Sequence, residues 1–169
     1  MPNQTENFTR VGSGDIYTQG GMANHTGSMN EMSVNDSLRA IGLFPEKRTY
    51  ESLWSTTRLS QVDCDLADLN ICAEYKYQEV SGTCDQKGAS ELYSAGQTLV
   101  CDDYVLVFSG PHWEKPRGAK LYKMYKDIAK NYNKHSDTFC VAAKRLHVMK
   151  RSEFIEFVAQ RKKEKLQNG

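Results

Sequence analysis

Two stretches near the middle of the chain alternate between apolar and polar residues, which is the period of a β-strand with two different faces. Residues 60–67 place Val62, Cys64 and Leu66 on one face, and residues 71–78 place their apolar side chains at odd positions. The residues between them, 68–70, suit a tight turn, so the pattern predicts a hairpin. Residues 104–108 are apolar throughout, which predicts a strand buried on both faces.

Helical spacing appears in four places along the chain. Residues 28–42 carry Val34, Leu38 and Ile41 on one side, with Ser28 as the N-cap and a glycine at the end. The other helices are predicted at residues 85–96 with Thr83 as N-cap, at residues 118–132, and from Ser152 onward. Short strands are predicted at residues 53–58 and 138–142.

The resulting order is helix, three strands, helix, strand, helix, strand, helix, which indicates one domain of the α/β class. Residues 1–28 are rich in Asn, Thr, Gly and Ser, and this composition predicts a flexible leader. We expect the folded domain at residues 29–160 and a basic tail at residues 161–169.

The composition narrows the class of protein. The chain has 169 residues, of which 39% are hydrophobic and 25% are charged, as in soluble globular proteins. It has no apolar run of the ~20 residues that a membrane helix needs, and its polar start shows no secretory signal. Its five cysteines lack metal-ligand spacing, so we expect reduced thiols, no zinc site and a cytoplasmic protein.

The net charge of +1 conceals two halves of opposite sign. Residues 1–111 contain 7 Lys and Arg against 15 Asp and Glu, whereas residues 112–169 contain 15 against 6. The halves therefore carry −8 and +9. An acidic metal pocket beside a basic surface would suit a polyanion, although lysine-rich helices often only have solvated faces.

Candidate chemistry is concentrated on the predicted hairpin. Glu74 and Lys76 are two residues apart and leave the same face of their strand. A turn centred between residues 69 and 70 would place Asp65 opposite Glu74 and Asp63 opposite Lys76. Glu31, in the first turn of the first helix, is either a capping carboxylate or a carboxylate directed into the same site.

Such a set of groups suits phosphodiester hydrolysis. Carboxylates can hold Mg²⁺, which prefers hard oxygen ligands, and a neighbouring cation can orient water or stabilise developing charge. Alternating polar residues on a hairpin are also common on the solvated side of a sheet, so the short Asp…Glu-x-Lys pattern is weak by itself.

A longer pattern resembles a known family. Val62-Asp63, Glu74-Tyr75-Lys76-Tyr77-Gln78, Ser81-Gly82-Thr83 and Lys87 resemble the PD-(D/E)XK nuclease superfamily, in particular its restriction-endonuclease-like members, and the likeness extends over residues 31–158. The resemblance implies a restriction-endonuclease-like αβββαβ core with a mixed central sheet flanked by helices. It also implies a Mg²⁺-dependent deoxyribonuclease, with Mn²⁺ as a substitute.

The family pattern assigns roles to individual residues. Asp63 and Glu74 match the metal ligands, Lys76 matches the lysine that prepares the attacking water, and Gln78 matches a glutamine that orients a ligand or contacts the backbone. Glu31 matches an acidic residue that some members place on the first helix. The proline that usually precedes the first aspartate is Val62 here, so Asp65 remains an alternative to Asp63.

The expected partner is DNA, cut within the chain. Lys87, Lys120 and Lys123 are candidate contacts to the DNA backbone. We expect no membrane partner and no nucleotide cofactor, and a homodimer would allow two copies to cut the two strands. The competing hypotheses are a module that binds nucleic acid without cutting it and a subunit of a defence or repair assembly on the same fold.

Overall fold

The computed structural model describes residues 19–51, 53, 59–81, 84–136 and 142–168. Its elements follow the predicted order of helices and strands. They are α1 (Gln19–Ala40), β1 (Glu46–Glu51), β2 (Leu59–Leu66), η1 (Ala67–Leu69), β3 (Ile71–Tyr77), α2 (Cys84–Thr98), β4 (Cys101–Ser109), η2 (Pro111–Glu114), α3 (Pro116–Lys134), β5 (Ala143–Lys150) and α4 (Arg151–Asn168).

Several boundaries differ from those predicted. Helix α1 already begins at Gln19, so residues 19–28 are helical rather than a flexible leader. Helix α4 begins at Arg151 and runs to Asn168, so residues 161–168 continue a helix rather than forming a separate tail. Residues 1–18 and the proposed cap Thr83 lie outside the described residues.

The first and last strands lie at other positions than those predicted. Strand β1 occupies Glu46–Glu51, and all of the predicted strand 53–58 except residue 53 lies outside the described residues. Strand β5 occupies Ala143–Lys150, after the predicted strand 138–142, of which only residue 142 is described. Strands β1 and β5 are rich in charged residues, because each has one edge or face in water. Their sequences therefore contain no apolar run that would predict a strand.

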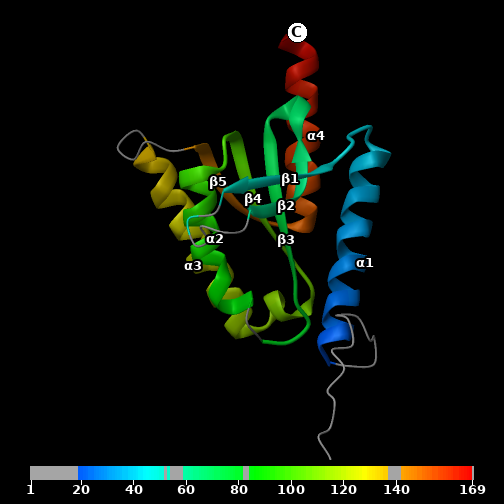
Figure 1. The fold of residues 1–169 in the computed structure, drawn as a ribbon, viewed down its shortest axis with the longest axis vertical. Helices are drawn as coiled ribbons and strands as arrows, with labels where there is room; N and C mark the ends of the chain where they lie inside the picture. The colour runs from blue at the N-terminus through cyan, green and yellow to red at the C-terminus, as the bar shows by residue number, and fades with distance from the viewer. Residues whose placement is uncertain (1–18, 52, 54–58, 82–83, 137–141, 169) are drawn as a thin grey trace, which may run out of the picture.

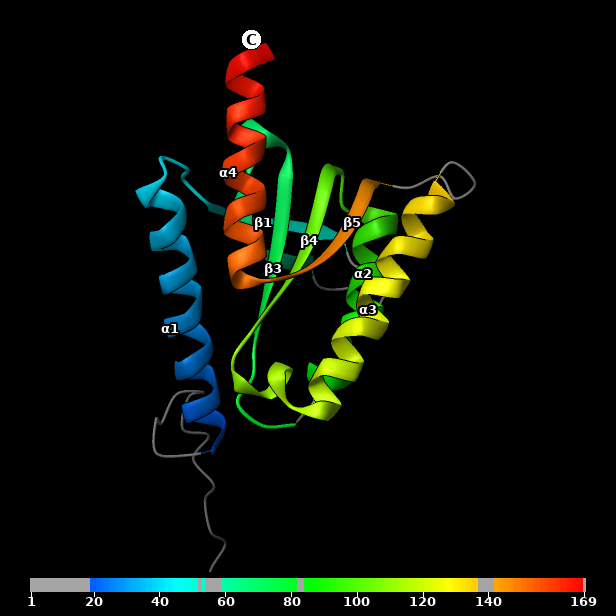
Figure 2. The ribbon, with the colours of Figure 1, turned by 180° about the vertical axis from the view of Figure 1, so that it is seen from behind.

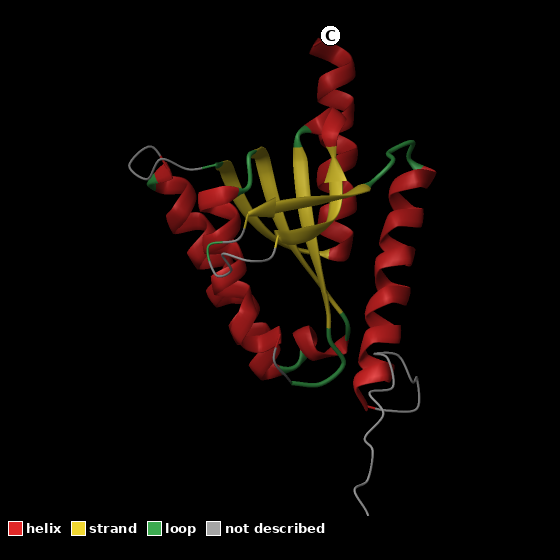
Figure 3. Cartoon of the chain, in the orientation of Figure 1, coloured by secondary structure: helices red, strands yellow, loops and turns green. Residues whose placement is uncertain are grey.

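The strands form one open, mixed sheet in the order β1-β2-β3-β4-β5. Strands β1, β2 and β3 are antiparallel neighbours, whereas β3, β4 and β5 run parallel. Helices α2 and α3 connect the parallel strands, as parallel pairing requires. Figure 3 shows the sheet between two pairs of helices. The protein is therefore an α/β protein.

A separate apolar core lies on each face of the sheet. One core joins the sheet to α2 and α3 and includes Leu92, Tyr104 and Tyr125. The other joins it to α1 and α4 and includes Leu38 and Phe154. Figures 1 and 2 show the two helix pairs on opposite sides of the strands. Strand β4 is buried on both faces, as its apolar run predicted.

Strand β2 contains a bulge at the position of the candidate aspartates. Glu46 pairs with Asp65 and Arg48 pairs with Val62, so β2 advances one residue more than β1 over this interval. As a result Val62 packs in the core of α2 and α3, whereas Cys64 packs in the core of α1 and α4. The prediction that Val62 and Cys64 share a face is therefore wrong. Bulges redirect side chains and are common next to active sites.

None of the described helices combines the length and the apolar character that a membrane span requires.

Candidate acidic site on strands β2 and β3

Strand β3 presents the central residues of the candidate site. Its odd positions, such as Ala73 and Tyr75, pack in the core of α1 and α4, and Cys72 packs on the opposite face. Glu74 and Lys76 follow Cys72 at even positions, so they project toward the side of α2. Both side chains are mostly buried, at 20% and 12% exposure. The expectation that these two residues share a face is confirmed.

The hairpin register selects between the two candidate aspartates. Asp65 pairs with Cys72 and Cys64 pairs with Ala73, so the prediction of Asp65 opposite Glu74 is wrong. Asp63 precedes the last pair of this register, Cys64 with Ala73, and lies within the β2 bulge. The Tyr75 N–H donates a hydrogen bond of 2.7 Å to Asp63 Oδ2, which holds that carboxylate next to Glu74.

The register differs because of the turn. The 3₁₀-helix η1 and Asn70 form the connection, and Asn70 adopts a left-handed conformation with φ of 52°. Residues 67–70 therefore form the turn, and its centre lies one residue earlier than we predicted. A shift of one residue at the centre moves each cross-strand partner by two residues and leaves the shared face unchanged.

The carboxylates of this site lie close enough to affect one another. Burial raises the pKa of Asp63 to about 6, and the nearby charges of Glu74 and Glu31 add to this rise. Burial also raises the pKa of Glu74, although Lys76 opposes the rise. We call Glu31, Asp63, Glu74 and Glu91 the acidic cluster. It draws side chains from α1, β2, β3 and α2.

Lys76 lies between two of these carboxylates. Its Nζ is 2.7 Å from Glu74 Oε1 and 2.9 Å from Glu91 Oε1. Burial favours a lower pKa for Lys76, but the charges of Glu74 and Glu91 and the hydrogen bonds to both outweigh it and raise the pKa above its usual value. Lys76 is therefore an ammonium ion at neutral pH.

A second lysine, Lys47, lies at the opposite side of the cluster. Its Nζ is 2.9 Å from Glu31 Oε1, and this side chain is half exposed. The hydrogen bond to Glu31 raises the pKa of Lys47, and the charges of Asp63 and Glu74 act in the same direction. Lys47 is thus the counter-ion for the part of the cluster that Lys76 does not contact.

Sequence reasoning missed both Lys47 and Glu91. Lys47 lies on β1, a strand that the pattern predicted several residues later, at residues 53–58. Glu91 directly precedes Leu92, which is fully buried. The sequence pattern predicted a helix over residues 85–96, but it could not indicate which strand the side chain of Glu91 meets.

The remaining predicted residues are spread more widely. Gln78 is buried just after β3, where its backbone N–H donates to Ser109 O and its carbonyl accepts from the His112 N–H. Lys87 is exposed near the start of α2, and Lys120 and Lys123 are exposed on α3. In the described part of the chain, these three lysines make no ion pair with the acidic cluster.

The acidic cluster suits a divalent cation by the type of its oxygen ligands rather than by the arrangement of its side chains. Among the described residues, no group of three or more His, Cys, Asp or Glu side chains is arranged to hold a metal ion. Lys76 and Lys47 instead occupy oxygens of Glu74 and Glu31. The donors are nevertheless the hard oxygens that Mg²⁺ prefers. Burial is the main cause of the raised pKa values of Asp63 and Glu74, and the charges of neighbouring carboxylates add to it. Asp63 and Glu74 therefore fit a divalent cation in their donor chemistry.

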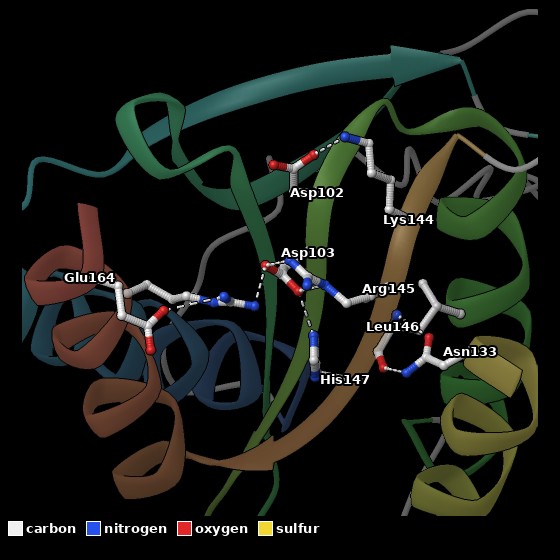
Figure 4. Close-up of polar contacts among 9 residues, drawn as sticks. Asp102, Asp103, Asn133, Lys144, Arg145, Leu146, His147 and Glu164 are labelled. Carbon is white, nitrogen blue, oxygen red and sulfur yellow. Dashed lines mark hydrogen bonds and ion pairs between the residues drawn. The ribbon is translucent and has the colours of Figure 1, made fainter. Parts of the chain in front are cut away.

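A second charged cluster lies around Asp103 on β4, whose side chain is only 2% exposed (Figure 4). Arg145 contacts both Asp103 oxygens at 2.7 and 2.8 Å, His147 approaches at 2.7 Å, and Arg161 approaches at 3.2 Å. These contacts join β4 to β5 and α4. Because the buried carboxylate is fully partnered, we interpret this cluster as structural.

Comparisons of the chain with protein-family models, with curated proteins and with solved structures find no match.

Proposed function

We propose that the protein is a Mg²⁺-dependent nuclease that hydrolyses phosphodiester bonds within DNA, with Mn²⁺ as a substitute for Mg²⁺. The observation that carries the proposal is the position of Asp63 beside Glu74, with Lys76 bound to Glu74 at 2.7 Å. Two crowded carboxylates next to one ammonium are a costly arrangement for a purely structural site, and perturbed pKa values are concentrated at functional sites.

The element order supports the same proposal. The run α1-β1-β2-β3-α2-β4 contains three antiparallel strands followed by a helix and a parallel strand. This is the αβββαβ core that the resemblance implied, and we propose that the fold is restriction-endonuclease-like. The candidate ligands Asp63 and Glu74 lie on the second and third strands of that run, β2 and β3.

Each side chain has a distinct role in the proposed reaction. Asp63 and Glu74 would hold the cation, which would polarise the phosphate and supply a metal-bound water as the nucleophile. Lys76 is held as an ammonium, so it cannot accept a proton and would donate hydrogen bonds to the water or to a phosphate oxygen. Glu31, which is paired with Lys47 here, would be a further candidate ligand, and Gln78 would orient a ligand from the end of the strand.

DNA would reach the site along a basic surface. Lys120 and Lys123 are exposed on α3, and Lys87 is exposed near the start of α2. Exposed lysines neutralise phosphates without reading the base sequence, so this surface supports binding that depends on salt and little on sequence. We also propose a homodimer, which would supply a second site for the second strand of the DNA.

The test is cleavage of supercoiled plasmid in Mg²⁺, Mn²⁺ or EDTA. We expect the parent protein to cut in either metal and to be inactive in EDTA, because the cation supplies the nucleophile. Lys76→Ala and Glu74→Gln should reduce cleavage by at least about 100-fold, the scale of losing one charge-stabilising group. Glu164→Gln, which removes a glutamate that contacts Arg161 on α4, should cut like the parent.

One observation favours a second candidate function. Because lysines occupy two carboxylates of the cluster and no three-ligand group is arranged among the described residues, the same fold could bind nucleic acid without cutting it. That function predicts steeply salt-dependent binding with no cleavage in any divalent metal. The plasmid assay distinguishes the two functions directly.

A further inference from the structure

Glu91 is the member of the acidic cluster that the family pattern does not assign. It lies on α2, and its Oε1 accepts a hydrogen bond of 2.9 Å from Lys76 Nζ. Its second oxygen, Oε2, is buried and has no hydrogen-bond partner among the described residues. The glutamate is therefore held at the site through its contact with Lys76.

Helix α2 supports Glu91 rigidly. Leu92 and Ala95 are fully buried against the sheet. Gly88 and Gly96 let α3 come so close that a Cβ atom at either position would lie within 2.8 Å of a tyrosine ring. A helix packed this tightly fixes the distance from Glu91 to the sheet. The packing therefore holds the backbone of Glu91 at a fixed position relative to Lys76.

Glu74 cannot serve Lys76 and a divalent cation equally well. Lys76 donates to Glu74 Oε1 at 2.7 Å, and a cation bound by Glu74 would compete with the ammonium for that carboxylate. Two neighbouring cations also repel each other. Lys76 is only 12% exposed, so an ammonium that left Glu74 without another partner would lose its charge compensation in a mostly buried place.

We propose that Glu91 is a positioning residue that keeps Lys76 at the site when Glu74 turns from the lysine to a divalent cation. This inference rests on the proposed function, because it requires the cluster to bind a divalent cation. In the cation-free protein the ammonium is shared by both glutamates. In the loaded protein the ammonium is held by Glu91 alone and stays next to the cation.

The test follows the Lys76 ammonium by NMR in the full chain, with no DNA present. A lysine ammonium gives a sharp ¹H–¹⁵N signal when hydrogen bonds protect it from exchange with water, and loss of the signal in Lys76→Arg identifies it. We expect the parent to keep the signal with and without Mg²⁺. Glu91→Gln should keep it without Mg²⁺, because Glu74 still holds the ammonium, and lose it with Mg²⁺.

Cation affinity supplies a second readout. Glu91→Gln should weaken Mn²⁺ binding by about 10- to 100-fold, the scale of removing a residue that orients a metal site through another group. Glu164→Gln changes the same residue type beside Arg161 on α4 and should leave the affinity unchanged. If Glu91→Gln does not fold, Glu91→Asp, which keeps the charge but shortens the reach, is measured in the same way. We then expect Glu91→Asp to weaken Mn²⁺ binding by less than the roughly 10- to 100-fold loss expected for Glu91→Gln.

The outcomes separate the inference from the function on which it rests. A Lys76 signal that persists in Glu91→Gln with Mg²⁺, or that disappears from the parent with Mg²⁺, overturns the inference even if the protein cuts DNA. The expected signals in a parent that does not cut DNA leave the inference intact and overturn the nuclease. A parent that binds no Mn²⁺ overturns both.

Discussion

Asp63 is a carboxylate that the fold buries beside other carboxylates. Burial and the charges of Glu74 and Glu31 raise its pKa to about 6, compared with about 3.9 in an unfolded chain. The folded protein therefore holds this proton more tightly than the unfolded protein between about pH 4 and pH 6. Folding stability from this group is present below pH 4 and is lost as the pH rises through 6.

Replacement of Asp63 should consequently stabilise the metal-free protein. We expect Asp63→Asn in EDTA to raise the free energy of unfolding at pH 7.5 by about 1–2 kcal/mol, because the amide carries no charge and its oxygen can still accept from the Tyr75 N–H. The gain should shrink toward zero at pH 4. Urea denaturation at the two pH values measures both quantities.

The matched control is Asp36→Asn on α1, an exposed aspartate whose described ion partner is Arg39. It should change stability by less than about 0.5 kcal/mol at either pH. A loss of stability in Asp63→Asn at pH 7.5 would contradict our account, since it would mean that the charged carboxylate is well compensated without a metal.

At the scale of elements, the bulge in β2 and the short turn before β3 determine which aspartate reaches the site. The period of two residues predicted correctly that Glu74 and Lys76 share a face of β3. It could not predict the register, because an apolar pattern is satisfied equally by two registers that differ by two residues. The apolar and polar pattern did not reveal the bulge, because the extra residue in β2 does not change the order of apolar and polar residues along the chain.

Charged strands are the second reason that the prediction was incomplete. Strand β5 contains Lys144, Arg145 and His147 between its buried positions, so it does not read as an apolar run. The buried carboxylate of Asp103 on β4 explains this composition, because Arg145 and His147 compensate it across the strand pair. Ion pairs between residues that are far apart in the sequence can be recognised only when the neighbouring strand in the sheet is known.

The Asp103 cluster leads to a prediction about stability. Asp103→Asn should lower the free energy of unfolding by about 1–3 kcal/mol, because the buried side chain loses charge-assisted hydrogen bonds to the partly exposed Arg145 and Arg161. The neighbouring Asp102→Asn should cost less than about 1 kcal/mol, since its partner Lys144 is 74% exposed. Urea denaturation of the two variants measures the difference, and equal losses would show that Asp103 is not the centre of this network.

The same cluster should also respond to acid. Burial by itself would raise the pKa of Asp103, but hydrogen bonds from His147 and Arg145 outweigh it and lower the pKa below its usual value. Stability from Asp103 is therefore present above the unfolded pKa and is lost as the pH falls through the folded pKa. The difference between the parent and Asp103→Asn should accordingly narrow in acid.

At the scale of the whole molecule, the two ends of the sequence differ in charge, and the folded protein carries much of the positive excess on α3. Lys120, Lys123, Lys126, Lys130 and Lys134 are all exposed on this helix. The sequence predicted this helix and its basic character well, because a lysine-rich amphipathic pattern is local. It could not place the helix relative to the acidic cluster, which depends on the packing of α2 and α3.

If this surface binds DNA, the logarithm of the affinity should fall linearly with the logarithm of the salt concentration. We expect replacement of both Lys120 and Lys123 by glutamine to reduce the slope by about 1 for each phosphate that the variant no longer neutralises. Lys163→Gln, an exposed lysine on α4, should leave the slope unchanged. Fluorescence anisotropy of a labelled duplex at several salt concentrations gives the slopes, and equal slopes for all three proteins would remove α3 from the interface.

The most direct test of the central claim is to locate Mn²⁺ by anomalous diffraction from crystals grown with that ion. Our account predicts a peak bonded to carboxylate oxygens of both Asp63 and Glu74, at the distances of about 2 Å typical of such ligands, with Lys76 beside it. The peak should be absent from crystals of Glu74→Gln. A peak elsewhere, or none with Lys76 still bound to Glu74 in saturating Mn²⁺, would contradict the account.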